Sequence, residues 1–148
     1  MDNKFIFVFG TLRKNNALNY VLKNCSYVVT TTLNGYKMYT NGLFPYIIPT
    51  TDKNKTVVGE IWKLPNGKKG IKKLKELDFI ETGYKRKNII ITHDKIKYFV
   101  GIYIYENKEY VIKKYPEVIS GDFNISIEEL RTLKSFRRSY NISPMRFF

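Results

Sequence analysis

The side chain in this sequence best placed for acid–base chemistry is the carboxylate of Glu81. It follows a segment in which apolar residues recur every three positions with lysines between them, as in a helix that buries one stripe: Ile71, Leu74, Leu77 and Ile80. Gly83 supplies the left-handed residue that commonly ends such a helix. Glu81 therefore falls in the last helical turn, where the partial negative charge of the helix C-terminus disfavours a carboxylate.

Two interpretations of Glu81 are open on these residues alone. The first is a solvated surface glutamate, which is the usual environment of this residue type. The second is a carboxylate with a raised pKa, which could transfer protons near neutral pH.

Other kinds of active site are disfavoured by the residue types present. The chain has one cysteine, Cys25, and one histidine, His93, which falls in an expected hairpin turn. They offer no Cys/His zinc cluster and no convincing nucleophile–histidine pair. The sequence also has no Walker loop and no dinucleotide-binding fingerprint. What remains is carboxylate chemistry.

A second candidate site is the loop Gly10-Thr11-Leu12. Residues 5–9 are apolar on both faces, as in a strand buried on two sides, and the loop interrupts them. Residues 17–23 have helical spacing, with Asn15 or Asn16 as the cap. Backbone N–H groups on the N-terminal side of a helix can bind an anion or a carbonyl oxygen. An ordinary strand-to-helix turn, which binds nothing, is the alternative.

The other elements predict an α+β protein. Strands are expected over residues 27–33, 36–39, 44–49, 57–64, 88–92 and 97–105. Gly59 suggests a bulge, residues 106–114 give no clear assignment, and Ser126 is expected to cap a helix with Glu128 and Glu129 in its first turn. Five to seven strands with two or three helices predict a sheet that curls into a small mixed barrel.

Length and composition bound the class of protein. A chain of 148 residues predicts a single domain, with residues 138–148 as a tail. No stretch approaches the roughly 18 consecutive apolar residues that span a bilayer, and no signal peptide is expected. One cysteine fits a reducing compartment, so we expect a cytoplasmic protein that does not bind membranes.

The formal net charge of +13 can attract nucleic acid nonspecifically. Most of the charge is lysine scattered along the chain, which favours solvated faces over a dedicated binding patch. The clearest cluster is near the C-terminus: Arg131, Lys134, Arg137, Arg138 and Arg146.

Six short motifs follow one another along residues 5–123. They are Phe9-Gly10-Thr11-Leu12-Arg13, Phe44-Pro45-Tyr46 with Ile48-Pro49, Val58-Gly59-Glu60-Ile61-Trp62, Leu77-Asp78-Phe79-Ile80-Glu81 with Tyr84 and Arg86, Gly101 to Tyr105, and Ser120-Gly121-Asp122-Phe123. Their order, spacing and total length resemble the γ-glutamylcyclotransferase-like family, in its branch of γ-glutamylamine cyclotransferase and AIG2-like proteins.

The resemblance implies a β-barrel flanked by helices, with a γ-glutamyl substrate held between the first loop and the acidic helix end. The α-amine of that substrate attacks its own γ-carbonyl and releases 5-oxoproline and a free amine, without a metal or cofactor. The resemblance places Glu81 as the general base. It places the backbone of Phe9, Gly10, Thr11 and Leu12 as the substrate cradle.

Two further residues of the motifs have a catalytic and a structural interpretation. In the catalytic interpretation, Tyr84 and Arg86 line the site. In the structural interpretation, Tyr84 packs on the barrel and Arg86 pairs with Asp78, and this structural role is favoured for Arg86. The family usually has tyrosine where this chain has Phe9, so the phenol hydrogen bond is lost while the backbone contacts remain. The interval between Glu81 and Tyr84 is short for the family.

A noncatalytic binding module is the alternative function. It would use the basic surface on nucleic acid or on an acidic partner. The presence of Glu81 favours the enzyme.

Overall fold

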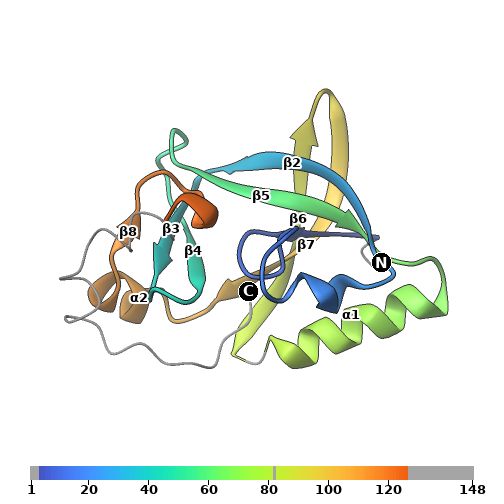
Figure 1. Ribbon diagram of the computed structural model, residues 1–148. Coiled ribbons are helices and arrows are strands. Elements are labelled where there is room, and N and C mark those ends of the chain that lie inside the picture. The colour runs from blue at the N-terminus through green and yellow to red at the C-terminus, as the bar shows by residue number, and fades with distance from the viewer. Residues whose placement is uncertain (1–3, 82, 127–148) are drawn as a thin grey trace.

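The computed structural model describes residues 4–81 and 83–126, which form eight strands and three helices (Figure 1). The strands are β1 (Phe5–Val8), β2 (Ser26–Asn34), β3 (Tyr36–Thr40), β4 (Pro45–Pro49), β5 (Thr56–Lys63), β6 (Tyr84–His93), β7 (Ile96–Tyr105) and β8 (Glu117–Val118). The helices are the 3-10 helix η1 (Asn19–Leu22) and the α-helices α1 (Lys68–Ile80) and α2 (Lys108–Lys114). The predicted α+β class is confirmed. No helix in the described ranges is long and apolar enough to cross a membrane.

The strands form two sheets. β1 is the middle strand of a five-stranded sheet with the order β2-β5-β1-β7-β6, antiparallel to β5 and parallel to β7. A smaller sheet has the order β4-β3-β8. The expected small mixed sheet with flanking helices is confirmed, but it does not close into a barrel, and the described residues contain eight strands where about five to seven were expected.

The chain passes from the first sheet into the second at Gly35. Gly35 has a φ of +81°, a conformation that favours glycine, and the turn directs the chain out of the first sheet and into β3. The outer strands of the first sheet, β2 and β6, do not pair, although a side-chain hydrogen bond joins them: Nδ1 of His93 lies 2.9 Å from Oγ1 of Thr31.

Two hydrophobic clusters lie on opposite faces of the five-stranded sheet. Alternate residues of β1 point to opposite sides, so Phe7 packs against the smaller sheet while Ile6 and Val8 pack against α1. The sequence pattern predicts that Phe5, Phe7, Val58 and Ile61 are buried in the core. Phe7 and Ile61 are buried, whereas Phe5 and Val58 are only partly buried. Val57 and Ile61 lie on the same face of β5, and Val58 lies on the other.

The segment expected to be a helix over residues 17–23 is instead the single 3-10 turn η1. A helix this short is marginal in water, and the preceding loop imposes other bonds. Leu18 N–H donates to Thr11 O at 3.0 Å, and Asn19 Nδ2 donates to Leu12 O at 2.7 Å.

The C-terminal part contains two helix starts. The unassigned residues 106–114 contain α2, which begins after Asn107, whose side chain accepts a hydrogen bond from Tyr110 N–H. Helical backbone also begins at Phe123, with Asp122 Oδ1 accepting from Asn124 N–H. Ser126 therefore lies inside this helical turn and does not cap it; its hydroxyl donates to Phe123 O.

Several predicted features lie outside the described residues. They are the acidic first turn at Glu128 and Glu129, the basic cluster of residues 131–146 and the tail of residues 138–148.

Gly59 has a packing role and does not form the predicted bulge. The register shift in the β2–β5 ladder lies between Tyr27 and Val29. A Cβ atom at Gly59 would lie 2.3 Å from the Phe7 ring and 2.7 Å from Val8 O. We therefore expect Gly59→Ala to lower the free energy of unfolding by about 1–3 kcal/mol through overpacking. An unchanged midpoint in urea denaturation would contradict this account.

Candidate active site

Glu81 is held by backbone hydrogen bonds at the C-terminal end of α1. Its N–H donates to Leu77 O at 2.9 Å, and its carbonyl accepts from Tyr84 N–H at 3.0 Å. Gly83, with a φ of +92°, makes the turn into β6, as the sequence pattern indicated. Helix, turn and strand therefore fix the position of the Glu81 backbone from both sides.

The Glu81 side chain is buried without a partner. The residue is 1% exposed, so it is not a solvated surface glutamate. Among residues 4–81 and 83–126, no group forms a hydrogen bond with either of its carboxylate oxygens. Burial raises the pKa of Glu81 to about 10. In the ligand-free protein the side chain is therefore a neutral carboxylic acid at pH 7.

In the loop after β1, the backbone carbonyl groups are hydrogen-bonded within the described residues, whereas two of the backbone N–H groups are not. Gly10 O accepts from Arg13 N–H and Asn16 Nδ2, Thr11 O from Leu18 N–H, and Leu12 O from Asn19 Nδ2. The N–H groups of Thr11 and Leu12 have no acceptor in the described part of the chain. Oγ1 of Thr11 is likewise buried without a described partner. We call residues 9–12 the cradle.

The cradle and the end of α1 share one hydrophobic cluster. Leu12 packs in the same cluster as Leu74, Leu77 and Tyr103, and Tyr84 packs against it. The structure therefore brings the cradle, Tyr84 and the helix of Glu81 to the same face of the large sheet. The Phe9 side chain belongs to the core on the other face, beside Phe7, which leaves only the Phe9 backbone for the site.

Tyr84 joins this region to a group of tyrosines that sequence reasoning missed. Its ring stacks on Tyr46, with centroids 6.1 Å apart, and lies 5.1 Å from Tyr105. Tyr46 also stacks on Tyr115 at 5.4 Å. These residues come from three strands and from the residue that follows α2, so no local pattern could have grouped them.

Arg86 has the structural role that the sequence favoured. Its Nε lies 2.9 Å from Asp78 Oδ1, and its Nη2 donates to Asp78 Oδ2 at 3.2 Å. The Tyr103 hydroxyl donates to the same Asp78 carboxylate at 2.6 Å. Burial, together with this hydrogen bond, raises the pKa of Tyr103.

We expect Asp78→Asn to lower the free energy of unfolding by about 1 kcal/mol. It weakens charge-assisted hydrogen bonds, but the Asp78 side chain is 40% exposed, so solvent screens the loss. Urea denaturation measures the change. A variant of unchanged stability that shifted the acid limb of a pH–rate profile would place Asp78 in the chemistry instead.

A buried ion-pair network next to the cradle was also missed. Arg13 lies between Glu60 of β5 and Asp122, and Arg13 and Glu60 are both buried. One signal was available: Glu60 is a single charge within the apolar run of β5. Its partners could not be read from the sequence, because 47 and 109 positions separate Arg13 from Glu60 and Asp122.

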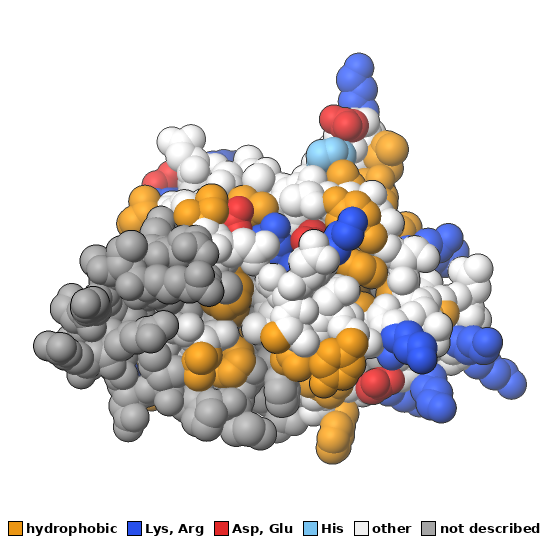
Figure 2. Space-filling model, in the orientation of Figure 1, with side chains coloured by type: hydrophobic (Ala, Val, Ile, Leu, Met, Phe, Trp, Pro, Cys, Tyr) orange, Lys and Arg blue, Asp and Glu red, His pale blue; other side chains and the backbone are white. Residues whose placement is uncertain are grey.

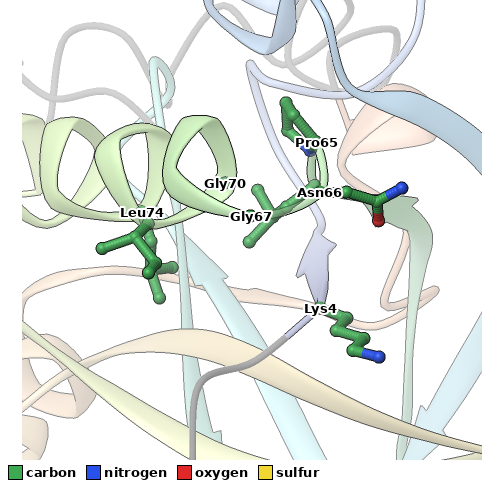
Figure 3. A pocket seen from close by; sticks show the side chains of 8 residues that line it. Lys4, Pro65, Asn66, Gly67, Gly70 and Leu74 are labelled. Atoms are coloured by element: carbon green, nitrogen blue, oxygen red, sulfur yellow. The ribbon is translucent and has the colours of Figure 1, made fainter.

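The hollow in Figure 3 lies away from Glu81, at the opposite end of α1. It measures about 180 Å³ and is lined by Lys4, Leu64, Pro65, Asn66, Gly67, Gly70, Ile71 and Leu74. Lysine side chains gather over this start of the helix, as Figure 2 shows. The lysine residues of α1 are therefore concentrated toward the start of the helix, and the buried carboxyl group of Glu81 lies at its other end.

Comparisons with known proteins agree with this fold. Residues 6–124 match the protein family described as gamma-glutamyl cyclotransferase, AIG2-like, and the chain belongs to that family. No curated protein matches the sequence significantly.

Three solved structures illustrate the shared fold. An uncharacterized protein from Pyrococcus horikoshii is 22% identical, with a TM-score of 0.61 and coverage of 88% of this chain and 98% of the other. Protein ytfP from Escherichia coli is 26% identical, with a TM-score of 0.55 and coverage of 80% and 94%. An AIG2-like protein from Mus musculus is 15% identical, with a TM-score of 0.58 and coverage of 78% and 87%.

Proposed function

We propose that this protein is a γ-glutamyl cyclotransferase that releases 5-oxoproline and a free amine from a small γ-glutamyl compound. The observation that carries the proposal is the buried carboxyl group of Glu81, unpartnered among the described residues. It lies at the end of a helix that shares a hydrophobic cluster with a cradle whose Thr11 and Leu12 N–H groups have no acceptor within the described residues. A buried polar group without a partner is costly. A ligand that hydrogen-bonds to it removes that cost.

Glu81 acts as the general base in this proposal. The substrate enters with its α-amine as an ammonium ion, and a cation in contact with a carboxyl group lowers the carboxyl pKa. Glu81 therefore loses its proton to solvent as the substrate binds. The resulting carboxylate then takes one proton from the ammonium, which frees the nitrogen lone pair for attack.

Glu81 also carries out the remaining proton transfers of the reaction. The amine nitrogen bonds to the γ-carbonyl carbon, and Glu81 gives its proton to the leaving nitrogen. The bond between that nitrogen and the carbonyl carbon then breaks, and Glu81 takes a second proton from the ring nitrogen. The products are 5-oxoproline and a neutral amine, and Glu81 is again the neutral acid of the ligand-free protein.

The cradle supplies electrostatic stabilisation in this mechanism. The N–H groups of Thr11 and Leu12 would donate to the oxygen that becomes negative when the γ-carbonyl is attacked. The nucleophile is tethered to its target, so holding the curled conformer already provides much of the rate increase. Tyr84 borders the substrate in this arrangement, and Phe9 contributes backbone only.

The proposal is tested by incubating the full chain with γ-glutamyl amino acids and γ-glutamyl amines and measuring 5-oxoproline by mass spectrometry. We expect 5-oxoproline and the free amine in equal amounts from at least one compound, with no metal added. The matched α-glutamyl isomers cannot close the ring in the same way and should give none. Absence of 5-oxoproline from the whole panel would overturn the proposed function.

A further inference from the structure

Arg13 leads the chain out of the cradle and is buried between two carboxylates. The residue is 6% exposed. Its Nε donates to Glu60 Oε2 at 3.1 Å, and its Nη1 donates to Asp122 Oδ1 at 2.9 Å. We call these three side chains the Arg13 clamp. The clamp joins the cradle to β5 on one side and to the start of the helical turn at Phe123 on the other.

Both acceptors of the clamp are also bonded to other groups. Glu60 Oε1 accepts from Lys14 N–H at 2.8 Å and from Trp62 Nε1 at 3.1 Å. Asp122 Oδ1 also accepts from Asn124 N–H at 2.9 Å. A buried charge is tolerated when its partners are in place and is strongly destabilising when one is removed. The clamp therefore restricts this part of the chain to conformations that keep all these bonds.

A second set of bonds joins the same two segments. Asn16 Nδ2 donates to Gly10 O and to Asn124 Oδ1, each at 2.8 Å. The carbonyls of Gly10, Thr11 and Leu12 thus accept from backbone and side-chain N–H groups of residues 13–19, which leaves the Thr11 and Leu12 N–H groups for another acceptor.

We propose that Arg13 is a positioning residue of the active site: through Glu60 and Asp122 it holds the cradle N–H groups where they meet the developing oxyanion. The inference rests on the proposed function. Arg13 itself does not touch the substrate. Because stabilisation of an oxyanion depends on preorganised donors, a small displacement of the cradle lowers turnover more than binding.

The test compares Arg13→Met, Asp122→Asn and their double variant in the full chain. Asn is a good helix cap, so Asp122→Asn keeps the cap while removing the charge that holds Arg13. Glu117→Gln is the matched control, because it removes the charge of the partly buried Lys55–Glu117 pair, which is not part of the clamp. Turnover and KM for 5-oxoproline release are measured below the melting temperature of each variant.

We expect kcat to fall by about 10-fold in Asp122→Asn and about 100-fold in Arg13→Met, with KM changed by less than about 3-fold. The double variant should be no slower than Arg13→Met alone, since both changes break one unit. Glu117→Gln should retain wild-type kcat. Folded Asp122→Asn and Arg13→Met proteins with wild-type kcat would overturn the inference.

A second readout does not require catalysis. The N–H groups of Arg13 and Leu18 are hydrogen-bonded to the cradle carbonyls of Gly10 and Thr11. Amide hydrogen exchange of Arg13 and Leu18, followed by NMR, should be at least about 10-fold faster in Asp122→Asn than in wild type, while core amides of β1 exchange as before. Unchanged exchange of these two amides would overturn the positioning role. If wild type released no 5-oxoproline, the proposed function would fail, and the exchange data would still decide whether Arg13 positions the cradle.

Discussion

Glu81→Gln is expected to lower kcat for 5-oxoproline release by about 100- to 10,000-fold and to leave KM nearly unchanged. Glutamine has the shape of the neutral carboxylic acid that the ligand-free protein holds at this position, so folding and substrate binding should survive. It cannot accept a proton from the substrate ammonium, so the chemical step loses its base.

The matched control is Glu76→Gln on the same helix. Glu76 is half exposed and its carboxylate lies 3.3 Å from Lys73 Nζ, so this variant makes the same Glu-to-Gln change on α1 without touching the buried site. Wild-type turnover is expected for this variant. A Glu81→Gln protein that cyclised γ-glutamyl compounds at the wild-type rate would remove Glu81 from the role of base.

The second large effect of Glu81→Gln is on stability, and it depends on pH. The pKa of Glu81 is about 10 in the folded protein, against 4.5 for an unperturbed glutamate. Between these values the folded chain retains a proton that the unfolded chain has released. The contribution of Glu81 to stability is therefore complete below pH 4.5 and is lost as the pH rises toward 10, by about 1.4 kcal/mol per pH unit.

Glutamine has no such titration, so the stability difference between the variant and wild type should grow in favour of the variant as the pH rises. Urea denaturation of both proteins at several values from about pH 5 to pH 9 measures this difference. Other titrating groups are common to both proteins and cancel in the comparison. Parallel stability curves over this range would mean that Glu81 titrates at its ordinary pKa.

The position of Glu81 could be predicted from the sequence because the signals are local. The three-residue recurrence from Ile71 to Ile80 defines α1, and Gly83 marks its end. The burial of Glu81 could not be predicted in the same way. It results from packing between α1, the cradle and β7, and the same local pattern also fits an exposed glutamate.

The features that sequence reasoning missed all depend on distant contacts. The Arg13 clamp joins residues 13, 60 and 122, and the stacked tyrosines come from separate strands. The predicted barrel failed for a related reason. The strand patterns predicted most of the strands, but whether the outer strands β2 and β6 pair depends on how far the whole sheet curls, which no local pattern encodes.

The most direct test of the account is the protonation state of Glu81 itself. Carbon-13 NMR of protein labelled at the glutamate carboxyl groups reports it, and the Glu81 resonance is the one that disappears in Glu81→Gln. We expect the resonance of a protonated carboxyl group that does not titrate between about pH 4 and pH 8 in the free protein. Saturation at pH 7 with a γ-glutamyl analogue whose γ-carbonyl is replaced by a methylene group should convert it to a carboxylate. A Glu81 resonance that titrates near pH 4.5 in the free protein, and does not respond to the ammonium ligand, would contradict the account.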